Sequence, residues 1–114
     1  MSANDLIDFA HFEQVHMHVG QIVAVKLNEK ARIPAYILTI DFGDLGVKIS
    51  SAQLTQNYTI DNLVGRKICA VTNFNPKRVA GIISEVLVLA STCAKNGTLL
   101  LSPDQQCING SRIF

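Results

Sequence analysis

Residues 36–49 read YILTIDFGDLGVKI, and this stretch decides the fold. Its first half has apolar residues at alternate positions, which is the period of a half-buried strand: Tyr36, Leu38, Ile40 and Phe42. After the glycine-rich residues 43–46 the alternation resumes, with Lys48 facing outward between Val47 and Ile49. The pattern therefore predicts a β-hairpin whose turn lies at residues 43–46.

The segment before this hairpin predicts a long first strand and a short helix. Apolar residues at 15, 17 and 19 alternate with histidines, and an apolar run at 22–25 follows Gly20, which we expect to form a bulge or a bend. Further upstream, residues 4–10 begin with a capping asparagine and early acids. They also carry the apolar set of an amphipathic helix, so we expect a helix there.

The segment after the hairpin predicts further short strands. In chain order we expect a helical turn at 52–57 capped by Ser51, a strand at 66–74, a basic turn at 75–81, a strand at 82–90, and a last strand at 98–101 after the turn pair Asn96-Gly97. Three strands, a small helix and two further strands are the order of an OB-fold. We therefore expect a mainly β protein with a five-stranded barrel.

Composition and hydropathy predict the number of domains and the cellular location. The chain has 114 residues, of which 48% are apolar and 17% charged, so residues 1–114 are expected to form one domain: a helix within 1–10, then a barrel and C-terminal extension over 12–114. No apolar run approaches the roughly 20 residues that span a bilayer. The acidic N-terminus also lacks the pattern of a secretory signal. We expect a cytoplasmic protein with no membrane partner.

No residue pattern indicates catalysis, a cofactor or a metal. There is no G-x-S-x-G turn and no phosphate-binding glycine loop, so we expect no enzyme activity. Cys69, Cys93 and Cys107 have neither disulfide nor zinc spacing and are interpreted as reduced, mostly buried thiols. His16 and His18 lie two apart on one strand face, and a metal site there would need a third ligand.

Charge is unevenly distributed along the chain. Residues 26–78 hold eight lysines and arginines against four acids, a balance of +4, whereas the rest of the chain has a balance of −3. This asymmetry indicates a basic face for an anionic partner, with an ordinary solvated surface as the alternative.

Lys77 and Arg78 are the strongest candidates for phosphate contact, because the turn at 75–81 would present both cations at the barrel rim. Asn73 and Ser84 are expected beside that turn, where an amide and a hydroxyl can reach base or ribose edges. Glu85 is a candidate for orienting the cations. The competing interpretation is a solubilising turn.

Other candidates are less specific. Arg32 and Lys30 belong to the first long loop, a usual ligand side of OB-folds, and Lys48 is a further basic candidate. Stacking of single-stranded bases is disfavoured, because alternation places Phe42 and Phe74 in or near the core. Only Tyr36 and Tyr58 are then left as exposed rings.

Apolar residues are in surplus at both chain ends, which predicts a covering partner subunit. We expect a homodimer whose interface includes Leu6, Phe9, Phe12, Ile108 and Ile113. An exposed groove for a peptide beside the dimer seam is the alternative.

Several motifs together resemble the CsaA family. They are VGQIV at 19–23, ARIPAY at 31–36, IDFG at 40–43, SSAQLT at 50–55 and NFNPKRVAGIISEVLVLA at 73–90. The last motif is the most specific, and the similarity runs from about residue 9 to the end. CsaA is similar in turn to the domain appended to the C-terminus of many methionyl-tRNA synthetases.

The resemblance implies a homodimeric OB-fold protein that binds tRNA, and we expect Lys77, Arg78, Asn73, Ser84, Arg32 and Lys48 to be its contact residues. It also implies a chaperone role toward unfolded precursor proteins destined for export. An alternative is a peptide-binding export chaperone whose tRNA binding is vestigial. The chain departs from the family pattern at His16-Met17-His18, where relatives usually have an acid and an arginine.

Overall fold

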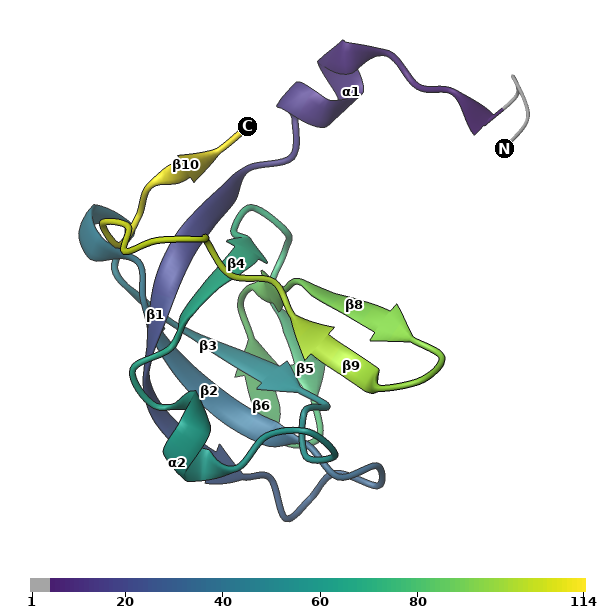
Figure 1. Cartoon of the computed structure of the whole chain (residues 1–114), viewed down its shortest axis with the longest axis vertical. Helices are drawn as coiled ribbons and strands as arrows, with labels where there is room; N and C mark the ends of the chain where they lie inside the picture. Colours follow the sequence, from purple (N-terminus) through teal and green to yellow (C-terminus); the bar gives the residue numbers. More distant parts are fainter. Residues whose placement is uncertain (1–4) are drawn as a thin grey trace.

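Strand β1 (Met17–Leu27) is central to the computed structural model, which describes residues 5–114 (Figure 1). Its antiparallel sheet has the strand order β3-β2-β1-β4-β7, and β10 also pairs with β1. The other elements are α1 (Phe9–Glu13), β2 (Tyr36–Asp41), the 3-10 helix η2 (Gly43–Leu45), β3 (Val47–Ala52), α2 (Ile60–Leu63), β4 (Lys67–Val71), β5 (Lys77–Val79), β6 (Ile82–Ser84), β7 (Leu87–Val88), β8 (Ala90–Cys93), β9 (Gly97–Leu100) and β10 (Arg112–Ile113).

The sheet curls into a nearly closed barrel, because the segment after β6 returns to β3. The backbone N–H of Glu85 donates to the carbonyl of Ile49 over 2.7 Å, and the hydroxyl of Ser50 donates to the carbonyl of Val86 over 3.1 Å. The mainly β, five-stranded OB-like barrel expected from the sequence is therefore confirmed.

The barrel core consists of apolar side chains from β1, β2 and β4 and from the segments that follow the strands. Ile22, Leu38, Ile40, Phe42 and Ile68 are fully buried. Leu63 of α2, the helix that follows β3 and precedes β4 in the chain, is also fully buried and belongs to the same core cluster. The small helix expected between the third and fourth strands is thus present.

Gly20 has a different role from the one predicted. The pairing register of β1 with β2 shifts between Ile22 and Ala24, and not at Gly20. A Cβ atom at Gly20 would lie only 2.6 Å from side-chain atoms of Ile40 and Phe42. Glycine is therefore needed there for close packing.

Both helices lie further along the chain than predicted. Helix α1 begins at Phe9, with Asp8 as its N-cap, whereas we expected a helix over 4–10; Asn4 lies outside the described residues. Strand β3 continues to Ala52, so Ser51 caps no helix.

Thr59 is the N-cap of α2 instead. Its hydroxyl accepts from the backbone N–H of Asn62, and the Asn62 side chain accepts from the N–H of Thr59. This reciprocal pair explains why the helix begins at Ile60.

The hairpin of β2 and β3 forms, but its second strand has the opposite facing from the prediction. Leu38 pairs with Ser50 and Ile40 with Lys48, so Ser50 and Lys48 face inward with the core residues of β2. Val47 is exposed and Lys48 is half-buried. The helix η2 uses residues 43–45, and β3 starts after it with its inward positions shifted by one residue.

Candidate functional site

The basic segment at 75–81, expected as a turn, contains a short strand at its centre. Lys77–Val79 form β5, which pairs with β6 (Ile82–Ser84), and the turn is only Ala80-Gly81. Both turn residues have positive φ, 46° and 86°. Two successive residues of this kind are typical of the tight turn that joins twisted antiparallel strands.

Asn28 anchors the tip of this hairpin to the barrel. The Asn28 side chain is only 5% exposed, and its amide nitrogen donates to the carbonyl of Ala80 over 3.2 Å. Its side-chain oxygen accepts from the backbone N–H of Lys30. The first long loop therefore helps to hold Ala80 in its left-handed conformation.

Lys77 and Arg78 are both exposed, but they lie on opposite faces of the hairpin. Lys77 pairs with Ser84 and Arg78 with Ile83, and successive strand residues point to opposite faces. Lys77 lines a groove on the barrel side, and Arg78 is not among the residues that line it. The two cations therefore cannot act together on one phosphate in this groove.

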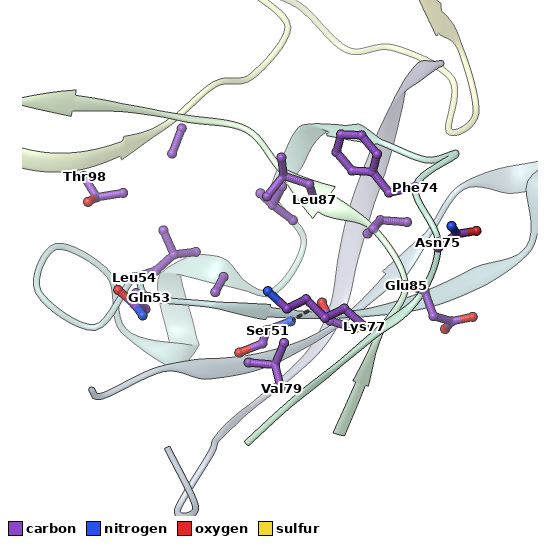
Figure 2. Close-up of a pocket in the computed structure, with 15 residues that line it drawn as sticks. Ser51, Gln53, Leu54, Phe74, Asn75, Lys77, Val79, Glu85, Leu87 and Thr98 are labelled. Atoms are coloured by element: carbon purple, nitrogen blue, oxygen red, sulfur yellow. Dashed lines mark hydrogen bonds between the residues drawn. The ribbon is translucent and has the colours of Figure 1, made fainter. Parts of the chain in front are cut away.

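The groove has a volume of about 720 Å³ and lies between β3, the β5–β6 hairpin and the β7–β9 region (Figure 2). It is lined by Ser51, Ala52, Gln53, Leu54, Phe74, Asn75, Lys77, Val79, Ser84, Glu85, Val86, Leu87, Val88, Ala90 and Thr98. This volume lies within the range of about 300–1,000 Å³ that is usual for ligand sites.

Ser84 and Glu85 help to close the barrel at the floor of the groove. The Ser84 hydroxyl accepts from the backbone N–H of Ser51 over 3.1 Å, shown as the dashed line in Figure 2. The Glu85 carboxylate accepts from the N–H of Ile49 over 3.0 Å. Both side chains therefore accept hydrogen bonds from backbone N–H groups of β3 that do not pair with a neighbouring strand.

Asn73 connects β4 to the segment before β1. Its amide nitrogen donates to the carbonyl of Gln14 over 2.8 Å, and its oxygen accepts from the N–H of His16 over 2.9 Å. It does not line the groove that contains Lys77 and Ser84.

The remaining basic candidates are spread over the surface. Lys26 and Lys30 line a second hollow of about 530 Å³ beside Ala80-Gly81. Arg32 is exposed in the first long loop, and Lys48 lies on β3. Of the sequence-predicted set, the structure brings together Lys77 and Ser84 in the groove and does not add Asn73, Arg32 or Lys48 to it.

Most of the cations have no internal hydrogen-bond partner. Within residues 5–114, the side chains of Arg66 and Lys67 donate to the carbonyl of Asn62 and to the Asn109 side chain, and no other lysine or arginine side chain makes such a bond. Arg66 also lies over the ring of Tyr58. Lys26, Lys30, Arg32, Lys77 and Arg78 are left available to an external anion.

The aromatic predictions are partly wrong. Phe42 is buried as expected, but Phe74 is 54% exposed and lines the groove. Tyr36, expected to be exposed, is buried, and its hydroxyl donates to the carbonyl of Tyr58. Sequence reasoning extended the strand from 66 through Phe74, whereas β4 ends at Val71. The residues Asn73, Asn75 and Pro76 could have indicated this earlier end.

His18 is a titratable group of β1 with a lowered pKa. Its Nδ1 lies 2.8 Å from the hydroxyl of Thr72. Burial lowers the pKa of His18, and the charges of Arg112 and His16 lower it further. Within the described residues, no group of three metal-ligating side chains is present.

The cysteines are half-buried free thiols. Burial, and to a lesser extent the neighbouring Cys107, raises the pKa of Cys69. Backbone hydrogen bonds from Asn96 and Lys95 lower the pKa of Cys93. No helix among residues 5–114 has the length and apolar character needed to cross a membrane.

Comparison with known proteins identifies the family. Residues 17–112 match the family described as "Putative tRNA binding domain". A structure titled chaperone CsaA from Bacillus anthracis is 42% identical, with a TM-score of 0.91, over 96% of this chain and 99% of that one. The chain belongs to the CsaA family of tRNA-binding domains.

Two further relatives show the range of the family. The CsaA chaperone protein of Picrophilus torridus is 44% identical, with a TM-score of 0.90, over 96% of this chain and 100% of that chain. The methionine–tRNA ligase of Methanobrevibacter smithii is 34% identical over 96% of this chain. This chain spans only 16% of that ligase, so the CsaA family has a counterpart that is a small part of a much larger enzyme.

Proposed function

We propose that the protein binds tRNA in the cytoplasm through the basic surface around the β5–β6 hairpin and catalyses no reaction on it. The match of residues 17–112 to the tRNA-binding domain family carries the proposal. The cations without an internal partner support it, because they can replace the counterions that surround RNA phosphates. Lys77, Arg78, Lys30 and Arg32 are the proposed contacts.

The test is a salt titration of binding to unfractionated tRNA. We expect log Kobs to fall linearly with log salt concentration, by about 0.7 to 0.9 per neutralised phosphate. A blunt DNA duplex serves as the control for unspecific attraction by positive charge. If the protein fails to bind tRNA at low salt, or prefers the DNA duplex, the proposal is wrong.

We further propose that the protein acts as a homodimer. Leu6 and Phe9 are each 70% exposed, and Ile108 is 82% exposed. Phe12 and Ile113 are half-buried. Helix α1 stands away from the barrel, on the same side as the C-terminus (Figure 1). A second copy that covers these side chains would remove an unusually large apolar surface from water.

A second candidate function is the holding of unfolded secretory precursor proteins. It is supported by the two CsaA structures titled as chaperones, which are similar to almost the whole of this chain. Apolar contacts depend little on salt, whereas phosphate contacts weaken steeply with it. Titration of a permanently unfolded, reduced protein at two salt concentrations therefore separates this function from tRNA binding.

A further inference from the structure

The groove beside the β5–β6 hairpin contains an aromatic ring that nothing in the described chain covers fully. Phe74 follows β4 and is 54% exposed at the groove wall. The lining residues Leu54 and Val86 are buried, and Leu87 adds further apolar surface (Figure 2). A flat apolar ligand would cover the Phe74 ring at little conformational cost, because the groove already exists.

The same groove has hydrogen-bonding groups that are not used internally. The side chains of Gln53, Asn75 and Thr98 line it and make no hydrogen bond within residues 5–114. An amide offers both a donor and an acceptor, which is what the edge of a nucleobase requires. The groove therefore combines a stacking surface with groups that can bind a base edge.

Lys77 gives the groove its positive charge. Its side chain lies across the groove near Ser51 and has no hydrogen-bond partner within residues 5–114 (Figure 2). Glu85 is the acidic residue of the lining, but its carboxylate points away from the Lys77 ammonium group and accepts the N–H of Ile49. An anionic group would thus meet Lys77 without an internal competitor.

From this combination we propose that the groove binds an unpaired nucleotide of the RNA. The base stacks on Phe74, its edge meets Asn75 or Gln53, and a neighbouring phosphate lies at Lys77. The inference rests on the proposed function and adds to it that recognition includes a single-stranded element of the tRNA. An unfolded peptide is a weaker candidate, because a groove that holds a cation, an exposed aromatic ring and free amides suits a nucleotide better than an apolar chain.

The test compares Phe74→Leu and Phe74→Tyr with the unchanged protein. The probes are unfractionated tRNA, a single-stranded RNA of about six nucleotides, within the usual size of an OB-fold site, and a blunt RNA duplex. We expect Phe74→Leu to weaken binding of tRNA and of the single strand by about five- to fifty-fold, with an unchanged salt slope and unchanged duplex binding. Phe74→Tyr retains the ring and should bind as the unchanged protein does.

Two matched variants complete the test. Lys77→Gln should weaken binding and also flatten the salt slope, whereas Lys95→Gln, an exposed lysine outside this groove, should do neither. Phe114→Leu is the control for loss of an exposed ring elsewhere. Thermal unfolding checks that each variant folds, which we expect because Phe74 is exposed.

The outcomes separate this inference from the proposed function. If the unchanged protein binds tRNA and Phe74→Leu binds it equally well, the nucleotide site is wrong and tRNA binding stands. A further outcome is that a reduced, unfolded protein displaces the short RNA from the unchanged protein and binds Phe74→Leu more weakly than the unchanged protein. In that case the groove binds peptide and the inference is overturned. If the unchanged protein binds no tRNA, the proposed function fails and the inference fails with it.

Discussion

At the level of single residues, Glu85 is committed to the barrel rather than to a ligand. Its carboxylate accepts the N–H of Ile49, and its own N–H donates to the Ile49 carbonyl. Removing the acceptor leaves a strand donor unpaired, so Glu85→Ala should lower the free energy of unfolding by about 1–2 kcal/mol. Urea unfolding measures this.

Glu85→Gln keeps an acceptor oxygen and is the matched control, for which we expect a smaller loss of stability. Neither variant should change the salt dependence of tRNA binding. A large change in that slope, with unchanged stability, would mean that Glu85 acts on the cations after all.

Lys77 and Arg78 are neighbours in sequence but face opposite sides of the β5–β6 hairpin. They therefore contact different phosphates if both contact RNA. We expect the double variant Lys77→Ala/Arg78→Ala to weaken tRNA binding by about one to a few kcal/mol at low salt and to flatten the salt slope by about 0.9 or less for each lost contact.

The free-energy losses of the two single variants should add up to that of the double variant, because their side chains share no partner. Binding isotherms of all four proteins test this. A double variant no weaker than either single variant would show that both side chains serve one phosphate. Unchanged affinity in every variant would move the RNA surface to Arg32 and Lys48.

At the level of elements, β10 pairs with β1 at His18, a histidine whose pKa is lowered. His18 lies opposite Arg112 of β10 and opposite Ala70 of β4, with Thr72 at its Nδ1 and His16 on its own strand. Burial, Arg112 and His16 lower the pKa of His18 below its ordinary value of 6.5. The unfolded chain therefore binds this proton more readily than the folded chain.

Stability should thus be highest above pH 6.5 and should fall as the pH drops from that value toward the lowered pKa. The hydrogen-exchange protection of β10 amides should fall in the same range, since His18⁺ and Arg112 would repel each other. His18→Gln should remove this part of the pH dependence, and an unchanged pH profile in that variant would contradict the prediction.

The alternation of apolar residues along the chain predicts where the strands lie, but it is less successful in predicting which of their side chains point into the core. It finds β1, β2, β3 and β4 because apolar period-two runs are local properties. It predicts the wrong set of inward-facing residues for β3. The helix η2 occupies residues 43–45 of the expected turn, and the inward positions of β3 are therefore shifted by one residue from the predicted ones. One buried serine, Ser50, which closes the barrel through Val86, could not be recognised without the neighbouring segment.

The candidate site shows the same limit. Sequence identifies Lys77, Arg78 and Ser84 as close neighbours, because a hairpin is a local structure. It does not find the groove, since that depends on how the hairpin folds back over β3, far away in sequence. It also places Phe74 in the core, because alternation cannot tell an exposed ring after a strand from a buried ring within it.

At the level of the whole molecule, both chain ends expose apolar side chains, which include Phe9 and Ile108. Deleting residues 108–114 would be a poor test of their role, because the N–H of Gly110 and the carbonyl of Ser111 bond to Val19 of β1. Side-chain substitutions avoid this damage. Phe9→Ser and Ile108→Ser change residues that are 70% and 82% exposed, so each leaves the folded subunit intact.

We expect the unchanged protein to sediment as a dimer at micromolar concentration and the double variant Phe9→Ser/Ile108→Ser to shift toward monomer. The reason is that the dimer loses two apolar contacts per subunit, and each contact counts twice across a two-fold axis. Ile33→Ser, which alters an exposed residue of the first long loop, should leave the dimer unchanged. A stable monomer of the unchanged protein would refute the dimer and leave the apolar surface available to an unfolded polypeptide.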